Sequence, residues 1–167
     1  PISFDKLDAG EIIMLGLFKD NPVVGKASTI IESSNDKLFS FIGNDLMTNY
    51  PRWSPEVKEL EKLTDGPIQS GTVCRQVRID QGNRSESTFK VKVFDSGSRI
   101  CFEGVSNPYR CDYMIEPIND SNSRLTFIFE LLSLDMHVRP FEKLVRFAIQ
   151  DGTARTVNNI KKLVESV

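Results

Sequence analysis

Residues 139–167 read RPFEKLVRFAIQDGTARTVNNIKKLVESV, and the periodicity of this stretch decides the fold of the chain. Its apolar side chains recur at spacings of three and four residues, which is typical of an amphipathic helix with one apolar face. Pro140 suits the first turn, where a missing N–H costs nothing. A helix of about 26 residues rises about 40 Å and needs a large concave surface to lie on. The apolar stripe consists of Phe141, Leu144, Val145, Ala148, Ile149, Val157, Ile160, Leu163 and Val164.

The sequence before this helix indicates an antiparallel sheet interrupted by short helices. Residues 23–32 form a strand-like run, and a cluster of helix-start residues at 33–36 precedes a first short helix. Two prolines in residues 46–55 favour a turn or a second short helix there. Strand-like runs with polar and apolar residues in alternation then follow, separated by turns rich in Gly, Asn and Asp. These runs are residues 57–63, 72–79, 86–94, 99–105, 109–118 and 124–132.

This order of elements predicts an α+β domain. A curved antiparallel sheet of about seven strands is expected to wrap around the long C-terminal helix, with two short helices after the first strand. Residues 23–167 are expected to form this single domain, and residues 1–22 an N-terminal appendage that packs on it. Within the appendage, Ile12–Phe18 fits either a helix or a short strand.

Composition limits the classes of partner and the location. The formal net charge of −2 gives no basic surface for nucleic acid or for an anionic membrane, so we expect neither as a partner. The run Ile12–Phe18 is too short to span a bilayer, and no leader-like pattern is present, so a cytoplasmic protein without integral membrane association is predicted. Cys74, Cys101 and Cys111 contain no C-x-x-C pair and are interpreted as reduced core thiols.

Four short motifs, in this order and spacing, resemble the START-like helix-grip superfamily (SRPBCC), in particular its polyketide cyclase/dehydrase and lipid-transport branch. They are Tyr50-Pro51-Arg52-Trp53-Ser54-Pro55, Gly71-Thr72, Ile115-Glu116-Pro117 and Ser123-Arg124-Leu125-Thr126-Phe127. The similarity covers about residues 23–165. It implies a hollow between the sheet and the C-terminal helix that holds hydrophobic molecules, often polycyclic or lipid-like. It does not fix a reaction, because the superfamily includes carriers, cyclases and proteins without an assigned activity.

The sequence lacks the motifs that are typical of several catalytic mechanisms. His137 is the only histidine, which excludes a multi-histidine metal site, and there is no Cys/His zinc spacing. No G-x-S-x-G elbow, G-x-G-x-x-G turn or Walker motif is present. We therefore expect neither a metal nor a nucleotide cofactor, and we interpret His137 as an exposed loop residue.

Polar residues on the strand faces are the remaining candidates for chemistry. Arg75 alternates with Val73 and Val77, and we expect this side of its strand to face inward. There Arg75 would either anchor a ligand oxygen or extend to solvent from the edge of the sheet. Tyr109 and Tyr113 share a face with Cys111, where their hydroxyls could orient a carbonyl, although core filling is favoured.

The wall of the hollow can be predicted in the same way. Trp53 and Tyr50 either line its mouth as a gate or, as we prefer, anchor the short helices to the sheet. Gly152 either permits close approach to the sheet or a bend, or marks a helix stop within 151–153. The predicted ligand-binding residues are Tyr50, Trp53, Val77, Phe89, Val91, Phe102, Cys111, Phe127, Phe129, Phe141, Val145, Ile149 and Gly152.

Three functional hypotheses follow. The first is a carrier that binds a small hydrophobic molecule of polyketide, lipid or aromatic type, as a monomer or homodimer. The second is a cofactor-independent polyketide cyclase, aromatase or dehydratase in which Arg75, Tyr109 and Tyr113 orient carbonyls and stabilise enolate charge. The third is an interaction protein with a filled core.

Overall fold

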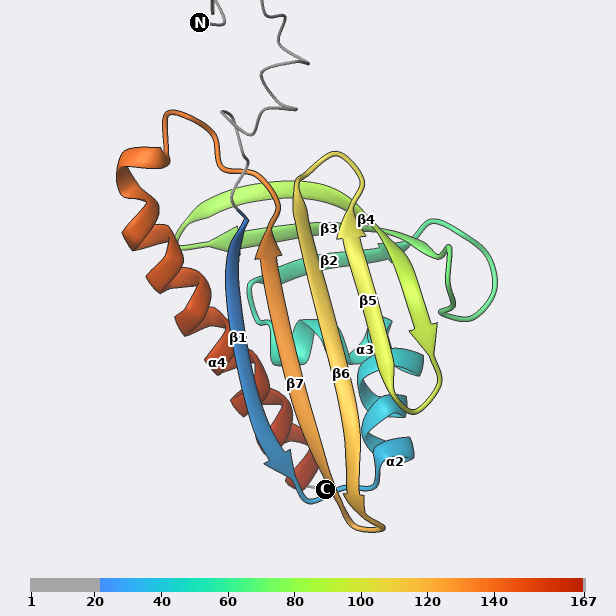
Figure 1. Cartoon of the computed structure of the whole chain (residues 1–167). Helices are drawn as coiled ribbons and strands as arrows, with labels where there is room; N and C mark the ends of the chain where they lie inside the picture. Colours follow the sequence, from blue (N-terminus) through green and yellow to red (C-terminus); the bar gives the residue numbers. More distant parts are fainter. Residues whose placement is uncertain (1–21, 167) are drawn as a thin grey trace, which may run out of the picture.

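The fold is a single antiparallel sheet curved around a long helix (Figure 1). The structure, a computed structural model, describes residues 22–166, so the expected appendage lies outside the described residues apart from Pro22. The strands are β1 (Val23–Ile31), β2 (Val57–Lys62), β3 (Val73–Asp80), β4 (Asn83–Asp95), β5 (Arg99–Gly104), β6 (Tyr109–Asn119) and β7 (Asn122–Leu131), in the spatial order β1-β7-β6-β5-β4-β3-β2. From β2 to β7 each strand pairs with the next in sequence, and β1 pairs with β7 and forms one edge of the sheet.

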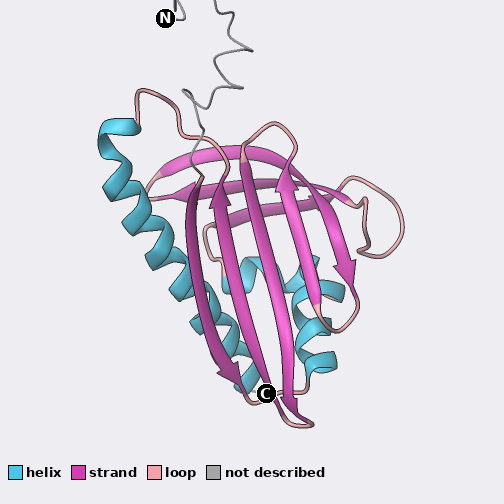
Figure 2. Cartoon of the chain, viewed as in Figure 1, coloured by secondary structure: helices cyan, strands magenta, loops and turns pink. Residues whose placement is uncertain are grey.

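The helices lie behind the sheet in Figure 2, which confirms the predicted helix-grip architecture. The first short helix begins after Ser34, whose hydroxyl accepts a hydrogen bond from the Lys37 N–H, as a helix N-cap requires. The second carries Pro51 and ends at Trp53. The helical elements are α2 (Asn35–Phe39), a π-helical turn (Ser40–Asn44), α3 (Leu46–Trp53), a 3-10 turn (Arg139–Phe141) and α4 (Glu142–Glu165).

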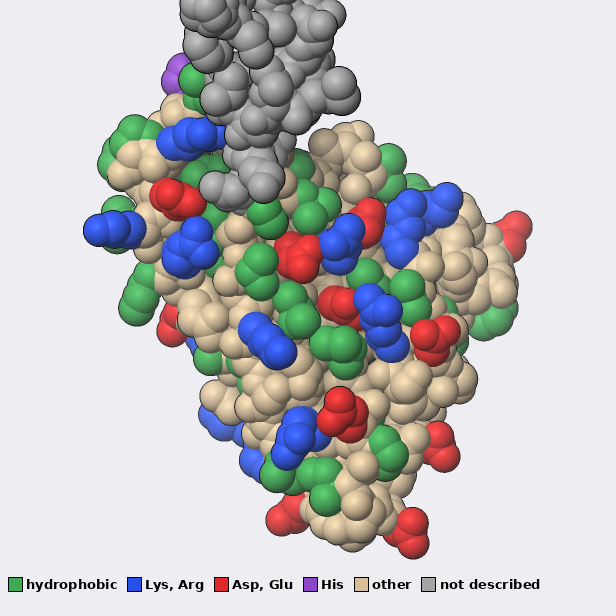
Figure 3. Space-filling model, viewed as in Figure 1, with side chains coloured by type: hydrophobic (Ala, Val, Ile, Leu, Met, Phe, Trp, Pro, Cys, Tyr) green, Lys and Arg blue, Asp and Glu red, His purple; other side chains and the backbone are tan. Residues whose placement is uncertain are grey.

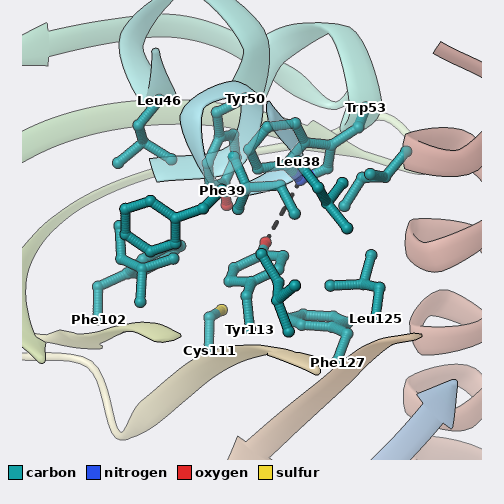
Figure 4. Packing of buried hydrophobic residues seen from close by; sticks show 14 of the residues in the cluster. Leu38, Phe39, Leu46, Tyr50, Trp53, Phe102, Cys111, Tyr113, Leu125 and Phe127 are labelled. Atoms are coloured by element: carbon teal, nitrogen blue, oxygen red, sulfur yellow. Dashed lines mark hydrogen bonds between the residues drawn. The ribbon is translucent and has the colours of Figure 1, made fainter. Parts of the chain in front are cut away.

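An aromatic cluster joins α3 to the inner face of the sheet (Figure 4). The Tyr50 ring lies 5.5 Å from that of Trp53 and 5.7 Å from that of Phe102. Trp53 is 1% exposed, and its Nε1 donates a hydrogen bond of 3.3 Å to the Tyr113 hydroxyl on β6. Since aromatic pairs add about 0.5–1.5 kcal/mol each beyond burial, this cluster anchors the short helices.

The outer face of the sheet carries charged side chains in ion pairs across neighbouring strands, as the mixed blue and red atoms of Figure 3 show. Arg99 on β5 pairs with Asp112 on β6 at 2.8 Å. Arg110 on β6 pairs with Glu103 at 2.8 Å and with Glu130 on β7 at 2.7 Å. The solvated face of the predicted two-faced sheet is therefore the convex one.

Helix α4 is held by its second half. Thr153, Val157, Ile160 and Val164 are buried, and α4 packs mainly along β1. At the start of the stripe Phe141 is 58% exposed and Leu144 is 68% exposed, so the predicted packing face was wrong at these two positions.

A glycine in β1 permits the close approach of α4. A Cβ atom on Gly25 would lie 2.7 Å from Cγ2 of Ile149 and 3.0 Å from its carbonyl oxygen. The interpretation of Gly152 as the close-approach residue was wrong, because a Cβ there would meet only Arg155 Nη2, at 3.8 Å. The alternative of a helix stop was also wrong, since α4 continues through Gly152.

None of the helices within residues 22–166 is long and apolar enough to cross a membrane.

Candidate ligand-binding cavity

A cavity of about 540 Å³ lies between the inner face of the sheet and α4. Its floor comes from β3, β4, β6 and β7, one end is closed by α3, and α4 forms a side wall. This volume falls in the range of pockets that hold small organic ligands. The lining residues are Tyr50, Trp53, Ser54, Glu56, Gln76, Arg78, Asp80, Ser85, Ser87, Asn107, Tyr109, Cys111, Tyr113, Phe127, Phe129, Val145, Ala148, Ile149, Gly152, Thr153, Arg155, Thr156 and Asn159.

One part of the wall is apolar and aromatic. Phe127 and Phe129 from β7 lie beside the tyrosines of β6, and the Tyr109 ring stacks on Phe129 with centroids 6.2 Å apart. Val145 and Ile149 face them from α4. Such a wall favours an apolar ligand body.

Arg78 supplies a cation on β3. Its Nη1 donates hydrogen bonds to the Tyr50 hydroxyl at 3.3 Å and to Ser54 Oγ at 3.2 Å, while Nε and Nη2 each bind Asp80 at 3.1 Å. Burial acts to lower the pKa of the Arg78 guanidinium, but Tyr50 and then Asp80 outweigh it and raise the pKa above its ordinary value. Arg78 is therefore a permanent positive charge in the cavity wall.

A second polar group is a network between β3, β4 and β6. The Nε2 atom of Gln76 donates to Ser87 Oγ at 3.2 Å and to the Tyr109 hydroxyl at 3.0 Å. The Oε1 atom of Gln76 is buried and has no hydrogen-bond partner among the described residues. Gln76 itself is only 2% exposed.

Burial favours the protonated form of the tyrosine hydroxyls and the cysteine thiol in the cavity wall. It raises the pKa of the Tyr50, Tyr109 and Tyr113 hydroxyls and of the Cys111 thiol. At neutral pH the tyrosines are therefore hydrogen-bond donors, and Cys111 is a protonated thiol rather than a nucleophile.

Two contacts tie α4 to the end of α3 beside the cavity. Asn159 Nδ2 donates a hydrogen bond of 3.0 Å to the Trp53 carbonyl oxygen, and Arg155 lies 3.5 Å from Glu56. Both contacts come from the part of α4 that follows Gly152.

In residues 22–166 no group of three or more His, Cys, Asp or Glu side chains is placed to hold a metal ion.

The structure brings most of the predicted site residues to this cavity. Trp53 and Tyr50 pack in the core, which agrees with the preferred anchor interpretation, and they also line the cavity, while a gate role stays a prediction. Contact of any of them with a ligand stays a prediction. The predicted residues that line the cavity are Tyr50, Trp53, Tyr109, Cys111, Tyr113, Phe127, Phe129, Val145, Ile149 and Gly152.

Arg75 was placed on the wrong face of β3. Its guanidinium pairs with Glu86 at 2.6 Å and with Glu59 at 3.2 Å on the outer face of the sheet. Val77 shares this face: although 3% exposed, it lies opposite Glu59 and Glu86 in the ladder and does not line the cavity.

Four further predicted residues lie away from the cavity. Phe89, Val91 and Phe102 are fully buried in the core cluster, and the Phe89 ring lies 6.3 Å from that of Tyr50 on α3. Phe141 is exposed at the start of α4.

The sequence interpretation missed Gln76, Arg78 and Ser87. These residues belong to the inward alternation of β3 and β4, where Gln76 lies opposite Ser87. The available signal was Cys74, a residue type that is commonly buried, two positions before Gln76 and four before Arg78. The position of Cys74 would have predicted that this face of β3 points inward.

Residues 23–165 match the family described as polyketide cyclase/dehydrase and lipid transport. A search of curated proteins finds no match.

Solved structures share the fold at low sequence identity. The Zhui aromatase/cyclase from Streptomyces sp. R1128 superposes with a TM-score of 0.72 at 11% identity, over 87% of this chain and 94% of that one. The protein TTHA0849 from Thermus thermophilus gives 0.67 at 15% identity, over 86% of this chain and 97% of that one. Norcoclaurine synthase from Thalictrum flavum, in complex with dopamine and hydroxybenzaldehyde, gives 0.65 at 16% identity, over 87% of each chain.

These structures support the fold alone, whereas the family match spans nearly all of the described residues. The chain thus belongs to the polyketide cyclase/dehydrase and lipid transport family, within the START-like helix-grip superfamily.

Proposed function

We propose that this protein binds a small, mainly hydrophobic molecule in the cavity between its sheet and α4. The observation that carries this proposal is the cavity of about 540 Å³, with an aromatic wall beside Arg78, a partly buried arginine. A filled core would leave no such space, so the interaction-protein hypothesis has less support.

The ligand carries an oxygen acceptor at the Arg78 end. Four of the five guanidinium N–H groups are used by Tyr50, Ser54 and Asp80, which leaves one donor. The Tyr50 hydroxyl accepts from Arg78, and its own hydrogen has no acceptor among the described residues. A carbonyl or carboxylate oxygen would accept from both groups.

Binding is tested with Trp53, the only tryptophan of the chain. Because Trp53 lines the cavity, a bound ligand should change its fluorescence. Protein purified without ligand removal would also be examined by native mass spectrometry. If no member of a hydrophobic panel alters Trp53 emission and no ligand is carried through purification, the proposal is wrong.

Arg78→Met is expected to weaken binding of 2-naphthoate about tenfold or more, since charge-assisted hydrogen bonds contribute about 1.5–3 kcal/mol. Isothermal titration calorimetry measures this, with 2-methylnaphthalene as the ligand that lacks the carboxylate. Arg75→Met is the matched control, because it removes the same side chain from the outer face of the same strand. An equal loss in both variants would contradict the role of Arg78.

A second candidate function is a cofactor-independent cyclase, aromatase or dehydratase. It is favoured by the same donors, since Arg78, Tyr50 and Tyr109 could hold an enolate oxygen while the aromatic wall folds the substrate chain. Arg78 here takes the role first assigned to Arg75. Incubation with a poly-β-ketone mimic tests this candidate: binding without turnover leaves only the carrier function.

A further inference from the structure

Gln76 has an unusual hydrogen-bonding state for a residue so deeply buried. We propose that Gln76 and Tyr109 form a subsite for a hydroxyl group on the ligand. The ligand class would then be apolar molecules that carry an alcohol or a phenol. This inference rests on the proposed function and specifies what the same cavity selects.

The direction of each hydrogen bond in the network follows from the amide. Nε2 of Gln76 donates one hydrogen to Ser87 Oγ and the other to the Tyr109 oxygen. Both hydroxyl oxygens therefore act as acceptors and keep their own hydrogens. Ser87 Oγ and the Tyr109 oxygen are 3.5 Å apart, so one of these hydrogens can be shared between them. The other has no acceptor within the described part of the chain.

The network thus contains one unused donor and one unused acceptor. The acceptor is Oε1 of Gln76, which is buried without a partner, and a buried unpaired carbonyl oxygen is unfavourable. Both Gln76 and Tyr109 line the cavity, but Oε1 itself is fully buried, so a ligand hydroxyl reaches it only when the Gln76 side chain moves. A ligand that supplies the missing partners would therefore be stabilised by more than burial of its apolar surface.

A hydroxyl group is the simplest group that fits, because it donates one hydrogen bond and accepts others. A methyl ether accepts but cannot donate to Oε1, and a methyl group does neither. A carboxylate would place negative charge against Oε1 and is better suited to Arg78. Gln76 and Arg78 are two residues apart on the same face of β3, so one ligand can reach both.

The test is isothermal titration calorimetry of the full chain with 2-naphthol, 2-methoxynaphthalene and 2-methylnaphthalene. The wild-type protein should bind 2-naphthol about tenfold or more tightly than the other two probes. In Gln76→Met, which keeps the length of the side chain but removes the amide, this preference should fall to about twofold or less. Gln69→Met is the matched control, since Gln69 is exposed outside the cavity, and its preference should equal that of the wild type.

A second variant keeps the inference testable if Gln76→Met unfolds. Tyr109→Phe retains the ring that stacks on Phe129 and removes only the hydroxyl, so it should reduce the preference for 2-naphthol while binding of 2-methylnaphthalene persists. Thermal unfolding of each variant is measured alongside.

The outcomes separate the two proposals. If the wild type binds none of the three probes, the proposed function itself loses its support. If it binds all three with equal affinity, or if Gln76→Met and Tyr109→Phe both keep the wild-type preference, ligand binding stands and the hydroxyl subsite is overturned.

Discussion

Gly152→Phe is expected to lower the affinity for 2-naphthol by about tenfold to a hundredfold while the protein remains folded, because overpacking costs about 1–3 kcal/mol or more. Gly152 lines the cavity from the middle of α4, and a Cβ atom there would have only Arg155 Nη2 within 4 Å, at 3.8 Å. A phenylalanine ring would therefore extend into the space that the ligand needs. Calorimetry gives the affinity, and thermal unfolding shows whether the fold is retained.

The control for this substitution is Gly152→Ala. Alanine replaces the poorest non-proline helix former at an interior position, so the free energy of unfolding should rise by up to about 1 kcal/mol. Its single methyl group should leave 2-naphthol binding within about twofold of the wild type. Unchanged affinity in Gly152→Phe would show that ligands bind elsewhere than in this cavity.

Gly25→Ala is expected to cause the largest loss of stability, about 1–3 kcal/mol of a typical total of about 5–15 kcal/mol. The new methyl group would lie 3.0 Å from the Ile149 carbonyl oxygen, which cannot move without shifting α4. Such a shift would also strain the Gln150 side chain, whose amide accepts from the Lys26 N–H at 3.1 Å and donates to its carbonyl oxygen at 2.9 Å.

Chemical denaturation measures this loss. Gly152→Ala again serves as the comparison, since the same substitution on the facing element should act in the opposite direction. An unfolding midpoint for Gly25→Ala equal to that of the wild type would mean that α4 does not pack on β1 through this contact.

The architecture could be predicted from the sequence because its signals are local. Alternation in β4 and β7, the Gly- and Asn-rich turns, and the apolar period of residues 139–164 each depend on near neighbours in the chain. The continuity of α4 through Gly152 was harder to predict, since packing along β1 outweighs the low helix propensity of glycine.

The face of β3 was harder to predict, because Cys74 was the signal for the inward side and three aliphatic residues pointed to the other. Val73, Val77 and Ile79 make one side look apolar, yet the side with Cys74, Gln76 and Arg78 faces inward. The outward position of Arg75 depends on Glu59 and Glu86, which come from two neighbouring strands. Those partners are known only when the pairing of the strands is known.

The division of the inner face also depends on tertiary structure. Phe89, Val91 and Phe102 have the same inward alternation as the cavity residues. They are nevertheless buried in the core beneath the short helices and do not line the cavity. Phe141 continues the apolar period of α4 at a point where the helix is exposed. Periodicity identifies a buried face without showing what covers it.

The unequal packing of α4 separates two time scales. Opening the cavity by moving residues 142–148 exposes little buried surface, since Leu144 and Phe147 are already 68% and 73% exposed, whereas Ile149 lies against Gly25 of β1. Global unfolding must also release Val157, Ile160 and Val164. Local opening therefore requires less free energy than unfolding, and ligand exchange can be fast in a protein that unfolds slowly. Substitutions in the first two turns of α4 would change the residence time of a ligand, whereas those after Gly152 would change the lifetime of the fold.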